Sequence, residues 1–369
     1  MEFKTDCVHY IGDKPCRFNR LCDGCGDYEP MGTRILIIKL ASIGDVLRTT
    51  PLLHALSREY PGNHTTWLVD RSAEGVLAGN RLIHRLLPMD LDATLRLRVE
   101  RFDIAINMDK DIRAAAVMAG VDATVKIGFT LGPDGGVRPL NAGSEYHFAL
   151  GLSDELKFRM NKKTYQELVY ESVGIPYSRD EYIYSPGPEA REYAEQVFRD
   201  CGLDRGGPVV GLNTGCGPVF ATKKWPIEGF ASLSDLIGES LGGHPVLLGG
   251  PDERSRNREI QALTSKSVPD AGTHHSIHQF AAIVGLCDIL VTVDTLAMHL
   301  AIALKCPAVV LFGPTCHQEV DLYDRGAKLF VDEPCSPCYR GSCPESKACM
   351  TRITPEAALE AVRKVLKTA

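Results

Sequence analysis

The chain alternates short apolar runs with segments whose apolar residues recur at helical spacing. In the first half the apolar runs cover residues 35–40, 65–69 and 104–107. In the second half they cover 208–213, 245–248, 289–293 and 308–312, and helical spacing covers 231–240, 254–263, 279–286 and 297–304. Buried strands that alternate with helices are typical of parallel sheets with helices on both faces. The pattern therefore predicts an α/β protein with two Rossmann-like, doubly wound domains.

Proline and glycine concentrate at residues 174–190, between the two sets of strands, and predict the boundary there. The length of 369 residues also favours two domains, at roughly 100 to 200 residues each. We expect a first domain at 31–180 and a second at 181–350, with a short N-terminal module at 1–30 and a C-terminal helix at 351–369. Residues 128–154 are rich in glycine and lack periodicity, which predicts a long loop.

Composition and charge exclude several classes of protein. Apolar residues make up 44% and charged residues 24% of the chain, as in ordinary globular proteins. The net charge is −6 and the basic residues are scattered, so we expect no nucleic-acid partner. The N-terminus lacks a signal-peptide pattern, and the most apolar long segment contains Asp294, His299 and Lys305. We therefore expect a cytoplasmic protein without a transmembrane segment.

The stretch ILIIKLASIGDVLRTTP, residues 35–51, is expected to form a strand, a loop and a helix. Ligands of open parallel sheets bind beyond the carboxyl ends of the strands, which is where Asp45 lies. Its structural interpretation is a helix N-cap that accepts backbone hydrogen bonds. An N-cap carboxylate that faces a cleft can also act as a general base, so the two interpretations are compatible.

Three further loops carry polar residues at expected strand ends. GLNTGCG follows the strand at 208–213, and Lys223 or Lys224 could bring a positive charge to a phosphate, although a lysine is more commonly a solvated surface charge. Glu253 follows LLGG, where an acid suits either a helix N-terminus or a ribose diol. Asp294 and Thr295 precede a helix that carries His299, which is either a site residue or a satisfied core histidine.

Five ordered motifs resemble the bacterial heptosyltransferases of glycosyltransferase family 9. They are KLASIGDVLRTTP, KKWP ahead of GFASL, LLGGPDE, VTVDTLAMHLAIAL and VLFGPT, and the resemblance runs from about residue 34 to the C-terminus. It implies a GT-B fold, in which two Rossmann-like domains face each other across a cleft, with the acceptor on the first and the nucleotide-sugar on the second. It also implies a final helix, here 355–366, that returns towards the first domain.

The resemblance assigns roles to individual residues. Asp45 matches the proposed general base, and Lys223 matches the lysine that neutralises the departing diphosphate. Glu253 matches the acid that contacts the ribose. The remaining positions of the expected donor site are Thr214, Lys224, Asp294, Thr295, Leu296 and His299. Leu296 departs from the family's usual Gly or Ser, and the insertion GCGPVFAT weakens the match at Thr214.

These roles imply an inverting glycosyltransferase that moves heptose, with ADP-heptose as the expected donor, onto a lipopolysaccharide core or related glycan at the inner membrane face. No D-x-D motif stands at a comparable strand end, so we expect no catalytic metal. Two alternatives share the same residues, namely a heptosyltransferase that modifies protein and a protein that binds nucleotide-sugars without turnover. Peripheral association with the inner membrane would accompany a lipid-borne acceptor.

Eight of the 13 cysteines fall into two clusters, which is unusual for a cytoplasmic chain. The first comprises Cys7, Cys16, Cys22 and Cys25, and the second, in a finger at 335–349, comprises Cys335, Cys338, Cys343 and Cys349. Four thiolates with one C-x-x-C pair suit tetrahedral zinc or iron. We expect two structural metal sites, with unligated thiols as the alternative for both and an iron–sulfur cluster as a rival for the first. Some protein heptosyltransferases that resemble this family hold iron in such a C-terminal finger.

Overall fold

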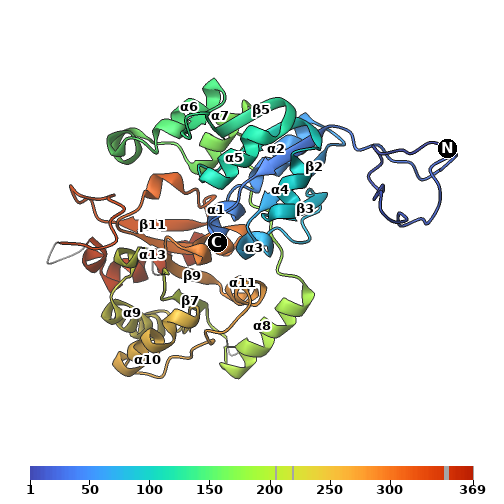
Figure 1. The fold of residues 1–369 in the computed structure, drawn as a ribbon. Helices are drawn as coiled ribbons and strands as arrows, with labels where there is room; N and C mark the ends of the chain where they lie inside the picture. Colours follow the sequence, from blue (N-terminus) through green and yellow to red (C-terminus); the bar gives the residue numbers. More distant parts are fainter. Residues whose placement is uncertain (204–205, 218–219, 345–348, 369) are drawn as a thin grey trace. The chain divides into compact units, whose positions relative to one another are not determined.

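The computed structural model describes residues 1–203, 206–217, 220–344 and 349–368. It divides into two compact units, coloured along the chain in Figure 1. The first unit comprises Met1–Ala41, Thr49–Phe148 and Leu168–Asp180, and the second comprises Ser42–Arg48, Ala149–Glu167 and Glu181–Ala369. The change after Asp180 lies within the stretch rich in proline and glycine. The seven residues from Ser42, which follow the first strand closely, nevertheless pack with the second unit.

The first unit contains a six-stranded sheet of order β3-β2-β1-β4-β5-β6. Neighbouring strands are parallel except for β6, which is antiparallel to β5. Ile35, at the centre, pairs with Thr65 on one side and Ile104 on the other. The strands are β1 (Arg34–Ile38), β2 (His64–Val69), β3 (Arg85–Pro88), β4 (Arg101–Asn107), β5 (Asp122–Leu131) and β6 (Val137–Pro139).

Helices in this part of the chain cover the sheet. Residues from β1, β2 and β4 form one core with the apolar side chains of α4 and α5. Burial of such side chains supplies most of the driving force for folding. The helices are α2 (Pro51–Glu59), α3 (Arg71–Glu74), α4 (Leu91–Leu97), α5 (Ile112–Gly120), α6 (Ala142–Ala149) and α7 (Tyr165–Val173).

The prediction of a long loop at 128–154 is wrong, because these residues include the end of β5, all of β6 and all of α6. The glycines form a hairpin, in which Gly132 N–H donates to the Gly136 carbonyl at 2.8 Å. The backbone of Gly128 has φ of +97°, a conformation that glycine adopts readily, and its N–H donates to Asn141 Oδ1 at 3.1 Å. A three-residue strand is too short to show periodicity, so the sequence pattern could not reveal it.

The second unit contains a five-stranded parallel sheet of order β11-β10-β9-β7-β8. The central strand β7 pairs with both β8 and β9, so that Val210 lies beside Pro245 and Ile289. The strands are β7 (Val209–Asn213), β8 (His244–Leu248), β9 (Ile289–Val293), β10 (Ala308–Phe312) and β11 (Gly326–Phe330).

Helices pack on the second sheet as two groups. Apolar residues of α9, α10 and α13 share one core with alternate residues of the strands, such as Val291 and Val293. Helix α11 contacts both α8 and α12. Figure 1 shows α9 and α10 on one side of β7 and β9, with α8 and α11 on the other. The helices are α1 (Ile43–Leu47), α8 (Pro188–Asp200), α9 (Ile227–Ser240), α10 (Arg254–Leu263), α11 (Ile277–Leu286), α12 (Leu296–Ala303) and α13 (Pro355–Thr368).

Short helical turns complete the second unit. They are a π-helical turn η1 (Leu156–Met160) and the 3₁₀ turns η2 (Ala221–Lys223), η3 (Pro251–Glu253), η4 (His317–Glu319) and η5 (Cys349–Arg352). Within the described residues, none of the helices combines the length and the apolar character needed to cross a bilayer.

Parallel strands end at a common edge of the sheet, and the loops beyond that edge are where open α/β sheets bind ligands. In the second unit the loop after β7 begins at Thr214, and the loop after β8 leads into η3. Strand β9 is followed by Asp294 and Thr295, just before α12. The fold therefore brings most of the predicted site residues to one edge.

Candidate functional site

A cavity of about 990 Å³ lies at this edge, and all of its lining residues belong to the second unit. Of the predicted site residues, seven line it: Asp45, Lys223, Glu253, Asp294, Thr295, Leu296 and His299. Thr214 and Lys224 are absent from its lining. The remaining lining residues that matter below are Gly44, Arg48, Lys157, Gly215, Gly249, Ile277, Phe280, Cys316 and Tyr339.

Asp45 is held at the cavity by a short helix. It is the third residue of α1, and Ser42 is the N-cap, so the expectation that Asp45 itself is an N-cap is wrong. Its Oδ2 accepts hydrogen bonds from the Ser42 amide at 3.3 Å and from Ser42 Oγ at 3.0 Å. An acid at the third position commonly reaches back to the N-cap amide in this way. These contacts hold the carboxylate in a defined orientation.

Arg48, which sequence reasoning missed, holds the other oxygen of Asp45. Its Nη2 lies 2.8 Å from Asp45 Oδ1, and its guanidinium lies 3.8 Å from the centre of the Tyr165 ring. Burial opposes the charge of Arg48, but Asp45 and the nearby tyrosines outweigh it and raise the pKa of Arg48 above its usual value. Arg48 therefore stays charged beside Asp45. An Asp followed by Arg three residues later on a helix was the available signal.

His299 lies on α12 directly beside α1. A Cβ atom added to Gly44 would come within 2.6 Å of His299 Cδ2, so only glycine allows this approach. Burial and, to a smaller extent, the positive charge of Arg48 lower the pKa of His299 to about 4, and the carboxylates of Asp294 and Asp45 only partly offset these effects. The imidazole is therefore neutral at neutral pH.

Tyr182 links His299 to the segment that holds Arg48. Gln166 Nε2 donates to Tyr182 Oη at 3.0 Å and to the Arg48 carbonyl at 3.1 Å. Tyr182 Oη lies 3.3 Å from His299 Nδ1. Because the tyrosine oxygen accepts from Gln166, its hydroxyl proton is available for Nδ1, which places the imidazole proton on Nε2. This chain of contacts fixes the ring of His299.

Lys223 places a cation on the cavity wall. Its Nζ donates to the Asp294 carbonyl at 2.7 Å and lies 3.9 Å from Asp294 Oδ2. The side chain is 15% exposed, so water screens its charge only partly. Residue chemistry alone left both Lys223 and Lys224 open, and the resemblance to the family assigned the leaving-group role to Lys223. The structure brings Lys223 to the cavity, at the end of η2, and leaves Lys224 off it.

Glu253 presents a carboxylate that lacks part of its hydrogen bonding. Its Oε2 accepts from the Gly250 amide at 3.0 Å, whereas Oε1 is buried and finds no partner within the described residues. Gly215 and Gly249 make room for this side chain, since an added Cβ would lie 2.1 Å from Glu253 Cδ or 2.6 Å from its Cβ. A buried oxygen without a partner is costly, which favours a ligand hydroxyl at Oε1.

The start of α12 forms the floor beside Lys223. Thr295 is the N-cap, with extended backbone, and Leu296 is the first helical residue. Asn213 Nδ2 lies 3.0 Å from Thr292 Oγ1 and 3.2 Å from the Gly215 carbonyl, which ties the ends of β7 and β9 together. Thr214 lies behind the wall, where its hydroxyl donates to Asn257 Oδ1 at 2.6 Å. Its contacts are therefore structural.

The lining of the same cavity also contains residues that sequence reasoning did not single out. The Tyr339 ring stacks on Phe158 at 5.4 Å, and Lys157 Nζ lies 4.1 Å from its centre. Tyr339 Oη accepts from the Cys316 amide at 3.3 Å, and burial raises the pKa of the Cys316 thiol to about 11. Ile277 and Phe280 add an apolar surface. These residues lie far apart in the chain, so no local motif connects them.

The cysteine clusters form separate hollows. Cys7, Cys16, Cys22 and Cys25 line one cavity of about 490 Å³, and Cys335, Cys338, Cys343 and Cys349 line another of about 220 Å³. All 13 cysteines are free thiols. In the described part of the chain, which omits residues 345–348 of the finger, no three His, Cys, Asp or Glu side chains are grouped closely enough to hold a metal ion. Metal binding therefore stays a prediction.

Comparison with known proteins identifies the family. The family described as glycosyltransferase family 9 (heptosyltransferase) matches residues 93–349, more than half of the chain. Lipopolysaccharide heptosyltransferase 1 of Pseudomonas aeruginosa is 26% identical over 360 residues, which cover 88% of this chain and 95% of the relative.

Two solved structures share the fold. A family 9 glycosyltransferase from Veillonella parvula superposes with a TM-score of 0.72 at 20% identity, covering 91% of this chain and 98% of that one. The iron-containing heptosyltransferase TibC of E. coli, solved with ADP-D-β-D-heptose, gives a TM-score of 0.56 at 11% identity, covering 92% and 77%. The family match, together with the motifs at the cavity, shows that this chain belongs to glycosyltransferase family 9 and is a glycosyltransferase.

Proposed function

We propose that this protein transfers heptose from ADP-heptose to a lipopolysaccharide core, with inversion at the anomeric carbon and without a catalytic metal. The observation that carries the proposal is the shared cavity, which places the carboxylate of Asp45 and the cation of Lys223 around one space. A base for the nucleophile and a charge for the leaving group are the two requirements of such a displacement. The Pseudomonas relative is named lipopolysaccharide heptosyltransferase 1, which supports heptose transfer to lipopolysaccharide.

Asp45 acts as the general base in this proposal. The acceptor oxygen attacks the anomeric carbon, its proton passes to the Asp45 carboxylate, and the bond from that carbon to the diphosphate oxygen breaks. Ser42 and Arg48 orient the carboxylate through the contacts described above. Positioning of this kind lowers the entropic part of the barrier.

The donor lies against the strand ends. Glu253 Oε1, buried and without a partner among the residues that the structure describes, accepts from a ribose hydroxyl, and Ile277 and Phe280 offer an apolar surface to the nucleobase. The diphosphate lies at the N-terminus of α12, beside Lys223. As the bond breaks, negative charge grows on the diphosphate and Lys223 stabilises it. A lysine in this place supplies the charge that a divalent ion supplies in other transferases.

Variants of the two neighbouring lysines test the leaving-group role. We expect Lys223→Met to lower kcat by about 10² to 10³, because it removes charge stabilisation of the transition state. Lys224→Met is the matched control and is expected to change kcat by less than about threefold, since its side chain is off the cavity. Equal losses in the two variants would show that the structure assigns the wrong lysine.

Variants of Asp45 and Glu253 separate catalysis from donor binding. Asp45→Asn is expected to lower kcat by about 10² to 10⁴ and leave the affinity for ADP unchanged. Glu253→Gln is expected to weaken ADP binding, measured by calorimetry. Asp252→Asn, an exposed neighbour, is the control for both. Near wild-type transfer by Asp45→Asn would exclude this residue as the base.

Labelled ADP-heptose added to lysate tests the acceptor. We expect label in the lipopolysaccharide fraction and little in protein, with activity that persists in a chelator such as EDTA. Label in protein alone would replace the proposed acceptor, and activity lost in chelator and restored by magnesium would contradict the metal-independent step. Because the acceptor is lipid-borne, we place the reaction in the cytoplasm at the inner membrane surface.

We also propose a structural ion, zinc or iron, at the second cysteine cluster. The donor set is four thiolates, which suits either metal. The finger is tied to the catalytic unit, because Arg159 Nη1 donates to the Ser336 carbonyl at 2.8 Å and Thr222 Oγ1 to the Arg340 carbonyl at 2.6 Å. Loss of one bound metal in Cys335→Ser/Cys338→Ser, measured by elemental analysis, is the expected result. An unchanged metal content would contradict the site.

A further inference from the structure

We propose that residues 1–33 fold around a single divalent metal ion, such as zinc, held by the thiolates of Cys7, Cys16, Cys22 and Cys25. This segment precedes the first strand, and the transfer reaction described above uses none of its residues. The inference is therefore independent of the proposed function. Four observations carry it, namely a common cavity, turns that begin at the cysteines, a pinned loop and the lack of an apolar core.

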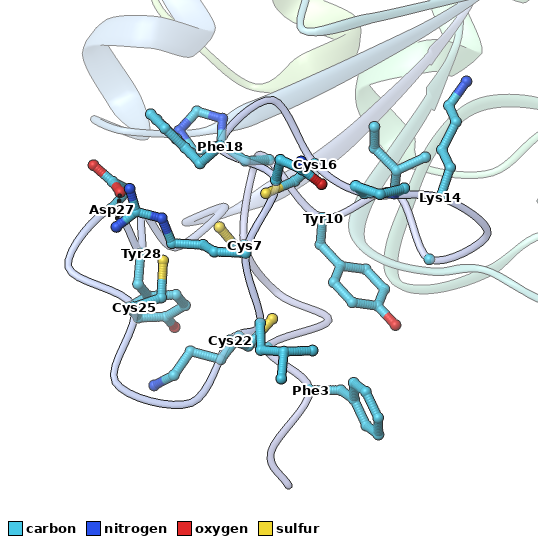
Figure 2. Close-up of a pocket in the computed structure, with 18 residues that line it drawn as sticks. Phe3, Cys7, Tyr10, Lys14, Cys16, Phe18, Cys22, Cys25, Asp27 and Tyr28 are labelled. Atoms are coloured by element: carbon cyan, nitrogen blue, oxygen red, sulfur yellow. Dashed lines mark ion pairs between the residues drawn. The ribbon is translucent and has the colours of Figure 1, made fainter.

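The four cysteines surround one hollow. All of them line the cavity of about 490 Å³, together with Tyr10, Phe18 and Tyr28. In Figure 2, Cys7 lies between the other three, which come from different turns of the same looping segment. The thiols are free, so no disulfide competes for them. Four thiols, the number that a tetrahedral donor set needs, thus line one hollow within a short sequence.

Three of the cysteines begin tight turns. The Tyr10 amide donates to the Cys7 carbonyl at 3.0 Å, the Asn19 amide to the Cys16 carbonyl at 2.9 Å and the Cys25 amide to the Cys22 carbonyl at 3.1 Å. Two of the turns contain a residue with left-handed backbone, Asn19 with φ of +49° and Gly24 with φ of +66°. Turns of this kind direct successive N–H groups to one side, which favours an anionic ligand atom such as a thiolate.

The ends of the segment are fastened to each other. The Val8 amide donates to the Glu29 carbonyl at 2.9 Å, and the Met31 amide to the Asp6 carbonyl at 2.8 Å. Cys7 and Pro30 form an antiparallel bridge at the same place. Cys7 therefore has a fixed position at the base of a closed loop, and the other three cysteines lie within that loop. Because this loop is already closed, bringing four ligands to one ion costs less conformational entropy.

The segment has no apolar core that could hold it together. All of residues 1–33 are described, and Cys7 is the one buried apolar residue among them. Phe3, Ile11 and Leu21 are exposed, by 61%, 49% and 62%. The segment contains no helix or strand before β1. A chain of this length without a core is held in other small domains by metal ions or disulfides.

His9 also lines this hollow and is another side chain that could bind metal. It is occupied elsewhere, because its Nε2 lies 3.2 Å from Glu29 Oε2 and 3.1 Å from Arg17 Nη2, and its ring packs edge-on against Phe18. The hollow is also larger than one ion needs. Binding must therefore draw the loops of Cys16, Cys22 and Cys25 inwards towards Cys7, which accounts for the absence of a preformed three-ligand group in the described residues.

Elemental analysis of the full-length protein, purified without oxygen, tests the proposal. We expect Cys22→Ser/Cys25→Ser to contain one equivalent of metal less than wild type, with acid-labile sulfide near zero in both. Cys201→Ser, a half-buried thiol outside both clusters, is the matched control and is expected to keep the wild-type content. Equal metal in all three proteins would overturn the proposal, and so would stoichiometric sulfide, which indicates an iron–sulfur cluster.

A second measurement keeps the test valid if the variant folds poorly. Wild-type protein is alkylated with and without prior treatment by a strong chelator, and each cysteine is scored by mass spectrometry. We expect Cys7, Cys16, Cys22 and Cys25 to become at least tenfold more reactive together after chelation, while Cys201 is unchanged. Reactivity that does not respond to chelation, or that responds at only one or two of the four, would overturn the tetrathiolate site.

Cobalt(II) added to chelated protein supplies a spectroscopic check. The background is Cys335→Ser/Cys338→Ser, so that the second cluster does not contribute. A charge-transfer band of thiolate-bound cobalt is expected in this background and is expected to vanish when Cys22→Ser/Cys25→Ser is added. Hydrogen exchange in residues 1–33 should slow on binding. A band that persists without Cys22 and Cys25 would place the ion elsewhere.

Discussion

Gly44 shows how one missing side chain positions the segment that contains the proposed general base. It belongs to α1, two residues after the N-cap Ser42, and it contacts the ring of His299 on α12. The close approach brings the carboxylate of Asp45 to the cavity that Lys223 also lines. The glycine in the motif SIGD is thus explained by packing between two helices, and the acid beside it is the proposed general base.

Replacement of Gly44 by alanine is expected to destabilise the protein by about 1 to 3 kcal/mol, because the new Cβ overlaps the buried imidazole. Chemical denaturation measures the change. Gly238→Ala in α9 is the matched control, since an added Cβ there meets nothing within 4 Å. The control should gain roughly 0.5 to 1 kcal/mol from helix propensity. A Gly44→Ala protein as stable as its control would contradict the packing described here.

His299 is expected to make stability depend on pH below neutrality. Its pKa is lowered by burial to about 4 in the folded state, against 6.5 for an unperturbed histidine. The unfolded chain therefore binds the proton first, so the stabilisation present above pH 6.5 is lost as the pH falls through 6.5 and levels off below 4. The loss between pH 7.5 and 5 should be about 2 kcal/mol.

Urea unfolding of wild type and His299→Gln at the two pH values measures this contribution. Glutamine cannot take up a proton in this range, so the variant should lose about 2 kcal/mol less than wild type on acidification. The charged groups around the ring, Arg48, Asp294, Asp45 and Lys223, are present in both proteins. Identical pH dependence in the two proteins would mean that His299 is not the buried neutral group described.

At the scale of elements, the sequence predicted buried, strongly patterned segments well. The strand expected at 289–293 and the helix expected at 254–263 agree with β9 and α10. Strand β5 was not predicted, because most of its residues are at least partly exposed and they lack a continuous apolar run. The break between α1 and α2 was missed because the apolar residues on either side of Arg48–Thr50 keep a spacing that one continuous helix would also show. Tertiary contacts decide such cases.

The candidate site was predictable only where a motif marked it. Asp45, Lys223 and Glu253 belong to motifs of the family, and all three line the cavity. Tyr339 and Lys157 reach the same cavity from elements that no local pattern connects to it. Thr214 was selected from a strand end, but its side chain points into the interior and bonds Asn257. A strand end gives the place of a residue and leaves the direction of its side chain open.

Helix α13 is an element whose contribution can be measured. Leu359, on its apolar face, is 7% exposed and belongs to the core of the second sheet. We expect Leu359→Ala to destabilise that unit by about 2 to 4 kcal/mol, through lost burial and the cavity left behind. The adjacent Glu360→Ala is the control. Its surface ion pair with Arg363 is worth less than about 1 kcal/mol.

The measurement is thermal or urea unfolding of the two neighbouring variants under the same conditions. Leu359→Ala should also weaken the hydrogen bond from Trp225 Nε1 to the Ile353 carbonyl, which is 2.9 Å long and joins the residues just before α13 to the loop before α9. A red shift of Trp225 emission would report it. If Leu359→Ala were no less stable than Glu360→Ala, α13 would not be part of the core.

For the whole molecule, the two tryptophans supply one probe for each unit. Trp67 is buried in the first unit and Trp225 in the second. The chain contains two tryptophans, so Trp67→Phe and Trp225→Phe leave a single reporter in each case. We expect ADP at about 100 times its Kd to stabilise the unit that Trp225 reports by roughly 2.7 kcal/mol, because the proposed donor ligands all belong to that unit.

Fluorescence-detected unfolding of the two single-tryptophan proteins, with and without ADP, measures both responses. The transition reported by Trp225 should move to higher denaturant. The transition reported by Trp67 should move by the same amount only if the units unfold together. A shift confined to Trp67, or none at saturating ADP, would contradict the assignment of donor binding to the second unit.

The membership of Ser42–Arg48 in the second unit has a consequence for engineering by recombination. A hybrid made by joining the first 180 residues of this chain to the second half of a relative would separate Gly44 from the histidine against which it packs. Both sheets of such a hybrid could fold correctly while Asp45, the residue after Gly44, is misplaced. A graft of donor specificity should therefore transplant this heptapeptide together with residues 149–167 and 181–369, as one discontinuous cassette.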